Sequence, residues 1–215
     1  MFYYFFSYGL VSFDAIILIT VLRLYQQTKH SVIGTLALWF GSRFLSVFLP
    51  YIWNDFFGWT TVHIQNFSVL VEGVLMVHFC KLLLAKETKL WRLLYALPVM
   101  IYLTELYLTK LGDVLYYTSS ISYYLLVCAL LYWVIQKAKI SIVLLRYVYV
   151  LLIFHITVMI YIINLSVILP NVKLMFIVYP VFFTICVLFD TISTFYFRKH
   201  TQHFIQTLYQ SENAY

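Results

Sequence analysis

Four residues that could carry chemistry lie within long apolar stretches of the sequence: Asp14, Arg43, Glu72 and His155. A charge at the centre of a bilayer costs about 3 kcal/mol or more unless it has a partner or water. Asp14 and Arg43 fall near the middle of successive stretches, so we expect them to pair, and Glu72 could share Arg43. With His155, they form a candidate ligand or ion pathway. The competing interpretation is an ion pair that holds two helices together and has only a structural role.

A second group of polar residues gathers in the fifth and sixth apolar stretches. Its candidate members are Tyr117, Ser119, Ser122, Tyr123, Tyr161 and Asn164. Hydroxyl groups and aromatic rings that converge in the outer half of a helical bundle would suit a small amphipathic ligand. Hydrogen bonding between helices, a common use of small polar residues in membranes, is the alternative.

The sequence predicts no cofactor and no metal site. His78 and His155 are the candidate axial ligands for a haem. Their predicted depths differ by about 9 Å at 1.5 Å per residue, too much for one haem. Cys80, Cys128 and Cys186 lie in apolar stretches without a CxxC pair, so no disulfide framework is expected. The HExxH, GxSxG and phosphate-loop motifs are absent, so an enzyme is not favoured. The last stretch has no lysine for retinal except Lys173 at its very edge, so a retinal protein is not expected.

The composition of the chain predicts the kind of fold that holds these residues in place. The chain is 64% hydrophobic and 10% charged, with a mean hydropathy of +0.91. Soluble domains are about 25% charged, so we expect an all-α polytopic membrane protein. The apolar stretches predict a bundle of seven transmembrane helices, over Tyr4–Tyr25, Val32–Asn54, Phe67–Lys86, Leu93–Leu111, Val114–Gln136, Ser141–Leu169 and Lys173–Phe197.

The fourth of these stretches is the least secure. It is short, it contains Glu105, and its boundary with the fifth rests on Lys110, Gly112 and Asp113. A bundle of six spans with a re-entrant fourth segment is therefore the main alternative.

The distribution of positive charge predicts the orientation. Eleven of the 14 Lys and Arg residues lie at one set of predicted helix ends, and two lie at the other. Cytoplasmic ends are rich in Lys and Arg, so we expect the N-terminus outside and the C-terminus inside. The net charge of +6 is explained in this way, without nucleic acid. Residues 1–199 would form the transmembrane domain and 200–215 a short cytoplasmic tail.

The last apolar stretch has two further features. Pro180 is expected to kink its helix, because proline lacks a backbone donor. Asp190 is placed in the inner part of the span, where Arg146 or Lys81 could pair with it.

Three functions fit these patterns. The first is a sensory or regulatory membrane module that binds a small or lipid-like ligand in its outer half and signals to a cytoplasmic protein partner. The second is a transporter or channel that uses the midplane polar cluster, in a homo-oligomer. The third and least favoured is an intramembrane enzyme acting on lipid. The expected location is a bacterial inner membrane or a plasma membrane, with the lipid bilayer as an obligatory partner.

Overall fold

A computed structural model describes residues 2–57, 61–84, 89–108, 113–168 and 175–212. Side chains are described within 9–49, 67–84, 89–107, 120–164 and 180–204, apart from 47, 105 and 106. The described residues form seven α-helices: α1 Phe2–Thr28, α2 Ser31–Phe57, α3 Thr61–Leu84, α4 Leu90–Leu108, α5 Asp113–Lys137, α6 Ile142–Ile168 and α7 Met175–Glu212.

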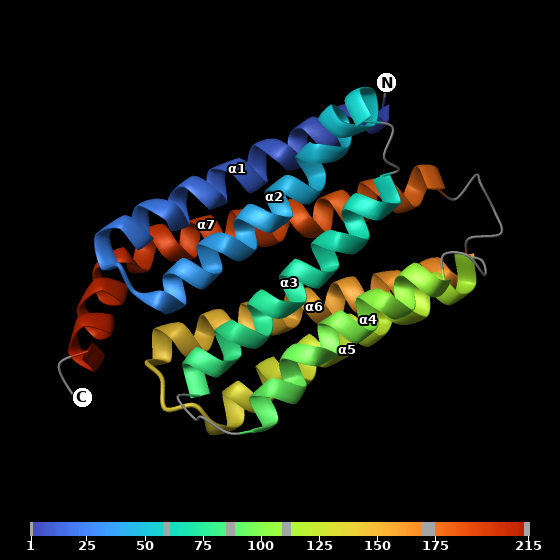
Figure 1. Cartoon of the computed structure of the whole chain (residues 1–215). Helices are drawn as coiled ribbons and strands as arrows, with labels where there is room; N and C mark the ends of the chain where they lie inside the picture. The colour runs from blue at the N-terminus through green and yellow to red at the C-terminus, as the bar shows by residue number, and fades with distance from the viewer. Residues whose placement is uncertain (1, 58–60, 85–88, 109–112, 169–174, 213–215) are drawn as a thin grey trace.

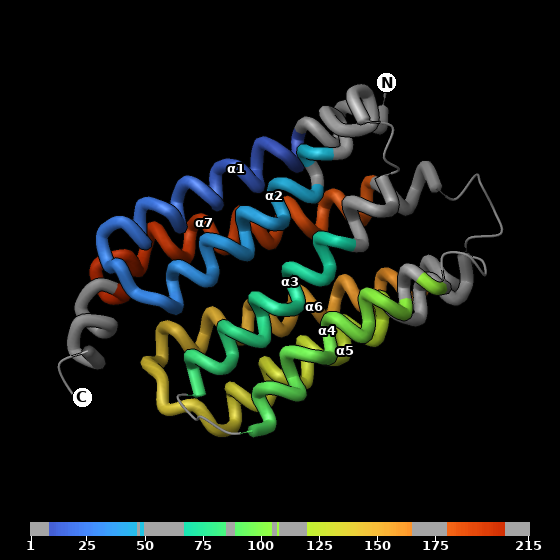
Figure 2. The backbone as a smooth tube through the Cα atoms, in the orientation of Figure 1, coloured from blue at the N-terminus to red at the C-terminus, as the bar shows by residue number. Residues whose placement is uncertain are grey.

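Six of the helices form a closed ring. In the order α1, α2, α3, α5, α6 and α7, each packs against the next, and α7 packs back against α1. α4 stands outside this ring and contacts α3 and α5, so it covers the groove between them. Figure 1 shows the helices alternating in direction, with the two termini at opposite ends of the bundle. The smooth trace of Figure 2 makes the same path easier to follow.

Apolar side chains from all six ring helices fill the interior. Large residues such as Trp39, Phe40, Tyr123, Tyr147 and Phe197 are fully buried there. Many leucines and isoleucines instead point outward and are exposed, as expected where helices face lipid rather than water.

Within the described residues, five helices are long and apolar enough to cross a membrane. Their apolar segments are Gly9–Thr28, Phe67–Leu84, Ser120–Lys137, Ile142–Asn164 and Pro180–Phe204. The prediction of a helical membrane protein is thus supported. That all seven helices cross the bilayer, in the predicted orientation, stays a prediction.

The contested fourth segment is a helix. Its described residues Leu90–Thr104 are apolar, and α4 as a whole has 19 residues, close to the length of a typical span of about 20 residues. Pro98 lies inside α4, and its ring packs close to Gly73 of α3. Its length and its place outside the ring leave the seven-span and the re-entrant interpretations both open.

α7 differs most from the sequence prediction. The span was expected to end at Phe197, before the basic residues Arg198 and Lys199. One helix of 38 residues continues through these two residues to Glu212, so the predicted tail is helical up to that residue. Where the membrane span ends within this helix stays a prediction. Pro180 lies inside the helix near its start, and the helix continues past it.

Candidate functional site

A tight hairpin brings Asp14 and Arg43 to the same level. α1 ends at Thr28, where Lys29 takes a left-handed backbone conformation with φ 53° and donates its N–H to the Tyr25 carbonyl. α2 begins at Ser31. Asp14 therefore lies 14 residues before the end of α1, and Arg43 lies 12 residues after the start of α2. Two residues of helix rise correspond to about 3 Å, so the two side chains meet at nearly equal depth.

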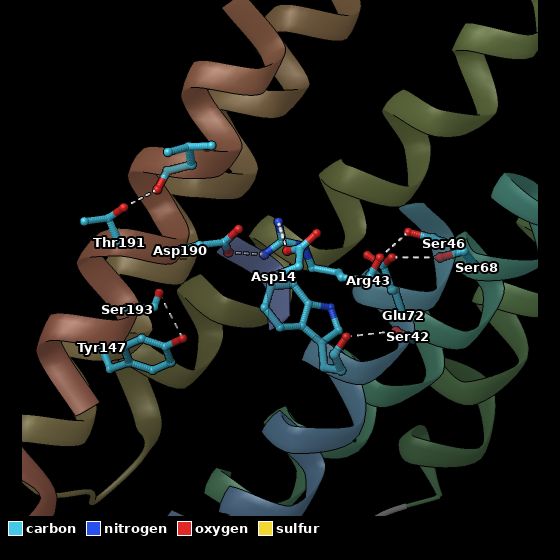
Figure 3. A network of polar contacts seen from close by, with 12 residues as sticks. Asp14, Ser42, Arg43, Ser46, Ser68, Glu72, Tyr147, Asp190, Thr191 and Ser193 are labelled. Atoms are coloured by element: carbon cyan, nitrogen blue, oxygen red, sulfur yellow. Dashed lines mark hydrogen bonds and ion pairs between the residues drawn. The ribbon is translucent and has the colours of Figure 1, made fainter. Parts of the chain in front are cut away.

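Arg43 joins three helices by ion pairs. Its Nη2 lies 3.3 Å from Oδ1 of Asp14 on α1, and its Nη1 donates a 2.9 Å hydrogen bond to Oδ1 of Asp190 on α7. Figure 3 shows the three side chains in one row between the helices. Asp14 is 1% exposed, Asp190 0% and Arg43 7%, so the triad is cut off from solvent. Since α2 and α7 are not neighbours in the ring, Arg43 reaches across its interior.

Aromatic rings enclose the guanidinium. Its Cζ lies 5.2–5.9 Å from the ring centroids of Trp39, Phe40, Phe154 and Phe189. A cation within about 6 Å of an aromatic face is attracted by the ring quadrupole, most strongly when water is absent. The shell therefore stabilises the charge of Arg43 and excludes water from it.

The charges of the triad do not balance when all three residues are ionised. Two carboxylates face one guanidinium, and both oxygens of Asp14 and Oδ2 of Asp190 have no hydrogen-bond partner among the described residues. A buried carboxylate oxygen without a hydrogen bond is costly. The site therefore has the capacity to hold one further positive charge, such as a proton.

Glu72 lies beside the triad without pairing directly with Arg43. Its carboxylate accepts a 2.9 Å hydrogen bond from Ser68 one turn earlier in α3, and among the described residues the ion pairs of Arg43 are those with Asp14 and Asp190. The next residue, Gly73, lies against the ring of Tyr123 on α5. Tyr123 is 1% exposed, and its hydroxyl has no hydrogen-bond partner.

The two membrane histidines have separate partners. Nδ1 of His155 lies 2.7 Å from the Leu151 carbonyl of its own helix, and its ring packs 5.9 Å from that of Trp39. His155 is therefore one aromatic ring away from Arg43. His78 lies 2.7 Å from the Tyr95 hydroxyl on α4.

The described members of the predicted outer pocket have different surroundings. Ser122 and Asn164 are exposed, and Asn164 donates to the Ile160 carbonyl of its own helix. Tyr123 is buried beside α3, as described above, whereas Tyr161 stacks on Phe182 of α7 at 5.2 Å. The side chains of the remaining two members, Tyr117 and Ser119, lie outside the described residues.

Asp190 is the site residue that the sequence interpretation misplaced. It pairs with Arg43, and not with Arg146 or Lys81 as suggested. Because Arg43 pairs with both Asp14 and Asp190, Asp190 lies at about the depth of Asp14, near the predicted middle of the bundle and not in the inner part of the span.

Within the described residues, no group of three or more His, Cys, Asp and Glu side chains could hold a metal ion. The chain matches no known protein family, no curated protein and no solved structure. Its function must therefore be argued from its own residues.

Proposed function

We propose that this chain is a sensory or regulatory membrane module, in which a ligand bound in the outer half shifts α7 and so signals to a cytoplasmic protein partner. The observation that carries the proposal is the ion pair between Arg43 and Asp190. It ties the middle of α7 to α2 across the ring, and α7 then continues as one helix to Glu212. A change in this contact would reach both ends of α7.

The surroundings of Arg43 favour this function over a channel. A conduction path needs water or a series of exchanging polar ligands along its length. Arg43 is instead enclosed by Trp39, Phe40, Phe154 and Phe189. Desolvated ion pairs of this kind suit an element with two discrete arrangements, since an intermediate geometry leaves a charge unpaired.

The outer half of α7 offers a place where a ligand could act. Tyr161 of α6 stacks on Phe182 of α7. Phe182 lies eight residues before Asp190 on α7. An amphipathic molecule that inserted between these rings would separate α6 from α7. The movement would be transmitted along α7 to the ion pair.

A photo-crosslinking experiment tests whether α7 contacts a partner. A photoreactive amino acid is placed at the exposed position Gln202, and at the exposed, membrane-level position Leu188 as a control. In cells of the source organism, we expect Gln202 to yield a protein adduct of defined mass. Leu188 should yield only lipid adducts. If neither Gln202 nor the exposed Lys199 yields a protein adduct, α7 has no cytoplasmic partner and the proposal fails.

A second candidate is a proton-coupled transporter, favoured by the uneven charge of the triad. Asp14, Asp190 and Arg43 carry a net charge of −1 when all are ionised, which one proton would neutralise. The test is proton flux into liposomes that enclose a pH-sensitive dye. Flux in the wild type that disappears in Asp14→Asn would establish transport, whereas the sensory proposal predicts no flux from either protein.

A further inference from the structure

A groove of about 400 Å³ lies between α1 and α7, at the end of the bundle where α1 finishes. Its polar rim contains Arg23 and Gln27 of α1, and Arg198 and Thr201 of α7. Ile16 and Ile19 line the part nearer the middle of the membrane. The groove therefore changes from apolar to basic along the direction of the helix axis.

The pattern on α1 follows from helical spacing. Ile16, Ile19, Arg23 and Gln27 are three or four residues apart, so they lie on one face of the helix. From Ile16 to Arg23 the helix rises about 10 Å. This distance matches the step from the upper acyl chains of a phospholipid to its headgroup. Ile16 and Ile19 are 44% and 51% exposed, which leaves their side chains open to an acyl chain.

The two arginines at the rim are available for a ligand. Both are exposed, and among the described residues the ion pairs belong to Arg43, not to Arg23 or Arg198. The Thr201 hydroxyl already donates to the Phe197 carbonyl of its own helix. The rim therefore presents two guanidinium groups of uncompensated charge, whose planar, forked donors match the oxygens of a phosphate group.

We propose that this groove binds one anionic phospholipid, with its phosphodiester between Arg23 and Arg198 and an acyl chain along Ile16 and Ile19. A headgroup of net negative charge is preferred because it offsets part of the charge of the two arginines, whereas a zwitterionic headgroup offsets none of it. Basic pockets between helices at the cytoplasmic interface are suited to such headgroups. The lipid would bridge α1 and α7, the same two helices that Arg43 joins at the midplane.

Native mass spectrometry in mild detergent tests this site. The full-length protein is titrated with phosphatidylglycerol and, separately, with phosphatidylcholine. Three proteins are compared: the wild type, the double variant Arg23→Gln/Arg198→Gln, and the control Arg92→Gln, which removes an exposed arginine from α4 outside the groove. We expect the wild type and Arg92→Gln to bind phosphatidylglycerol at least about tenfold more tightly than the double variant. Phosphatidylcholine binding should be the same in all three.

Other outcomes overturn the proposal. Equal phosphatidylglycerol binding by the double variant would show that the arginines do not hold the headgroup, as would equal affinity of the wild type for both lipids. Displacement of the lipid by millimolar inorganic phosphate would assign the rim to a soluble anion.

A second measurement avoids dependence on a variant. A phosphatidylglycerol with a photoreactive acyl chain is added to the wild type, and the crosslinked peptides are mapped. Labelling is expected within residues 16–27 and 198–201. Labelling spread evenly over all helices would contradict a defined site.

Discussion

At the scale of single residues, the buried guanidinium between two carboxylates behaves differently from a simple ion pair. Arg43 is the cation shared by Asp14 and Asp190, whereas either aspartate alone is enough to compensate Arg43. Removing one member of a buried pair normally costs about 3–5 kcal/mol, because the remaining charge is uncompensated. In this triad the cost therefore depends on which member is removed.

We predict that Arg43→Met lowers the free energy of unfolding by about 3–5 kcal/mol, because two carboxylates would remain buried without a cation. Asp14→Asn should cost no more than about 1 kcal/mol, since Asp190 still pairs with Arg43. The measurement is unfolding of the purified protein in mild detergent, followed by tryptophan fluorescence.

The double variant Asp14→Asn/Asp190→Asn provides the decisive comparison. We expect it to lose about 3 kcal/mol or more, well beyond the sum of the two single effects, because only the double variant leaves Arg43 without a carboxylate. Additive effects would show that the aspartates act independently and that shared compensation is wrong.

One of the two ion pairs of this triad was predictable from the sequence. Asp14 and Arg43 lie near the middle of consecutive antiparallel spans, so equal depth follows from counting residues. Asp190 can reach Arg43 only because α7 packs against α1 and closes the ring of helices. Local sequence patterns do not specify this contact between the two ends of the chain. The aromatic enclosure of Arg43 is also tertiary, since Phe154 and Phe189 come from α6 and α7.

At the scale of elements, α3 and α4 are in close contact at Gly73. A Cβ atom added there would lie 2.9 Å from Cβ of Pro98 and 3.2 Å from the ring of Tyr123. The proline ring is bonded to its own backbone, so it cannot turn aside as a flexible side chain would. The glycine is thus required by the packing of α4 onto the ring.

We predict that Gly73→Ala lowers stability by about 1–3 kcal/mol, because α4 must move away from α3. Gly41→Ala is the matched control, since a Cβ atom there would meet only Leu18, at an ordinary 3.8 Å. Thermal unfolding in the same detergent compares the two variants. Equal melting temperatures would mean that α4 is not held at this contact.

The existence of these elements was predictable, but their ends were less so. Continuous apolar stretches indicate where helices form in lipid, since the backbone must be satisfied internally. For α7, Arg198 and Lys199 predict the end of the membrane span, and the helix itself continues past them. Charges mark the membrane interface and do not stop a helix, because Arg and Lys are good helix formers.

At the scale of the whole molecule, an odd number of spans would place the termini on opposite sides of the membrane. We predict that Gln202→Cys reacts with a membrane-impermeant maleimide only after cells are permeabilised, because α7 carries this residue past the basic end of the bundle. Native Cys80 and Cys186 are buried and Cys128 is partly buried, but the test is best made with all three changed to serine.

Gly58→Cys, in the connection predicted to be outside, is the opposite control and should react in intact cells. If Gln202→Cys also reacts in intact cells, the number of spans is even and the six-span alternative gains support. The C-terminal part of α7 would then lie outside, and a protein partner would have to be sought on that side of the membrane.

The position of Asp190 divides α7 unequally, with 15 residues before it and 22 after it. At 1.5 Å per residue these are arms of about 22 and 33 Å. If the ion pair with Arg43 acts as a fulcrum, α7 is a lever seated in the membrane. A tilt of about 10° would carry the far end of the longer arm by about 6 Å. A partner bound to the longer arm would be moved in the direction opposite to the displacement of the shorter arm, and about 1.5 times as far.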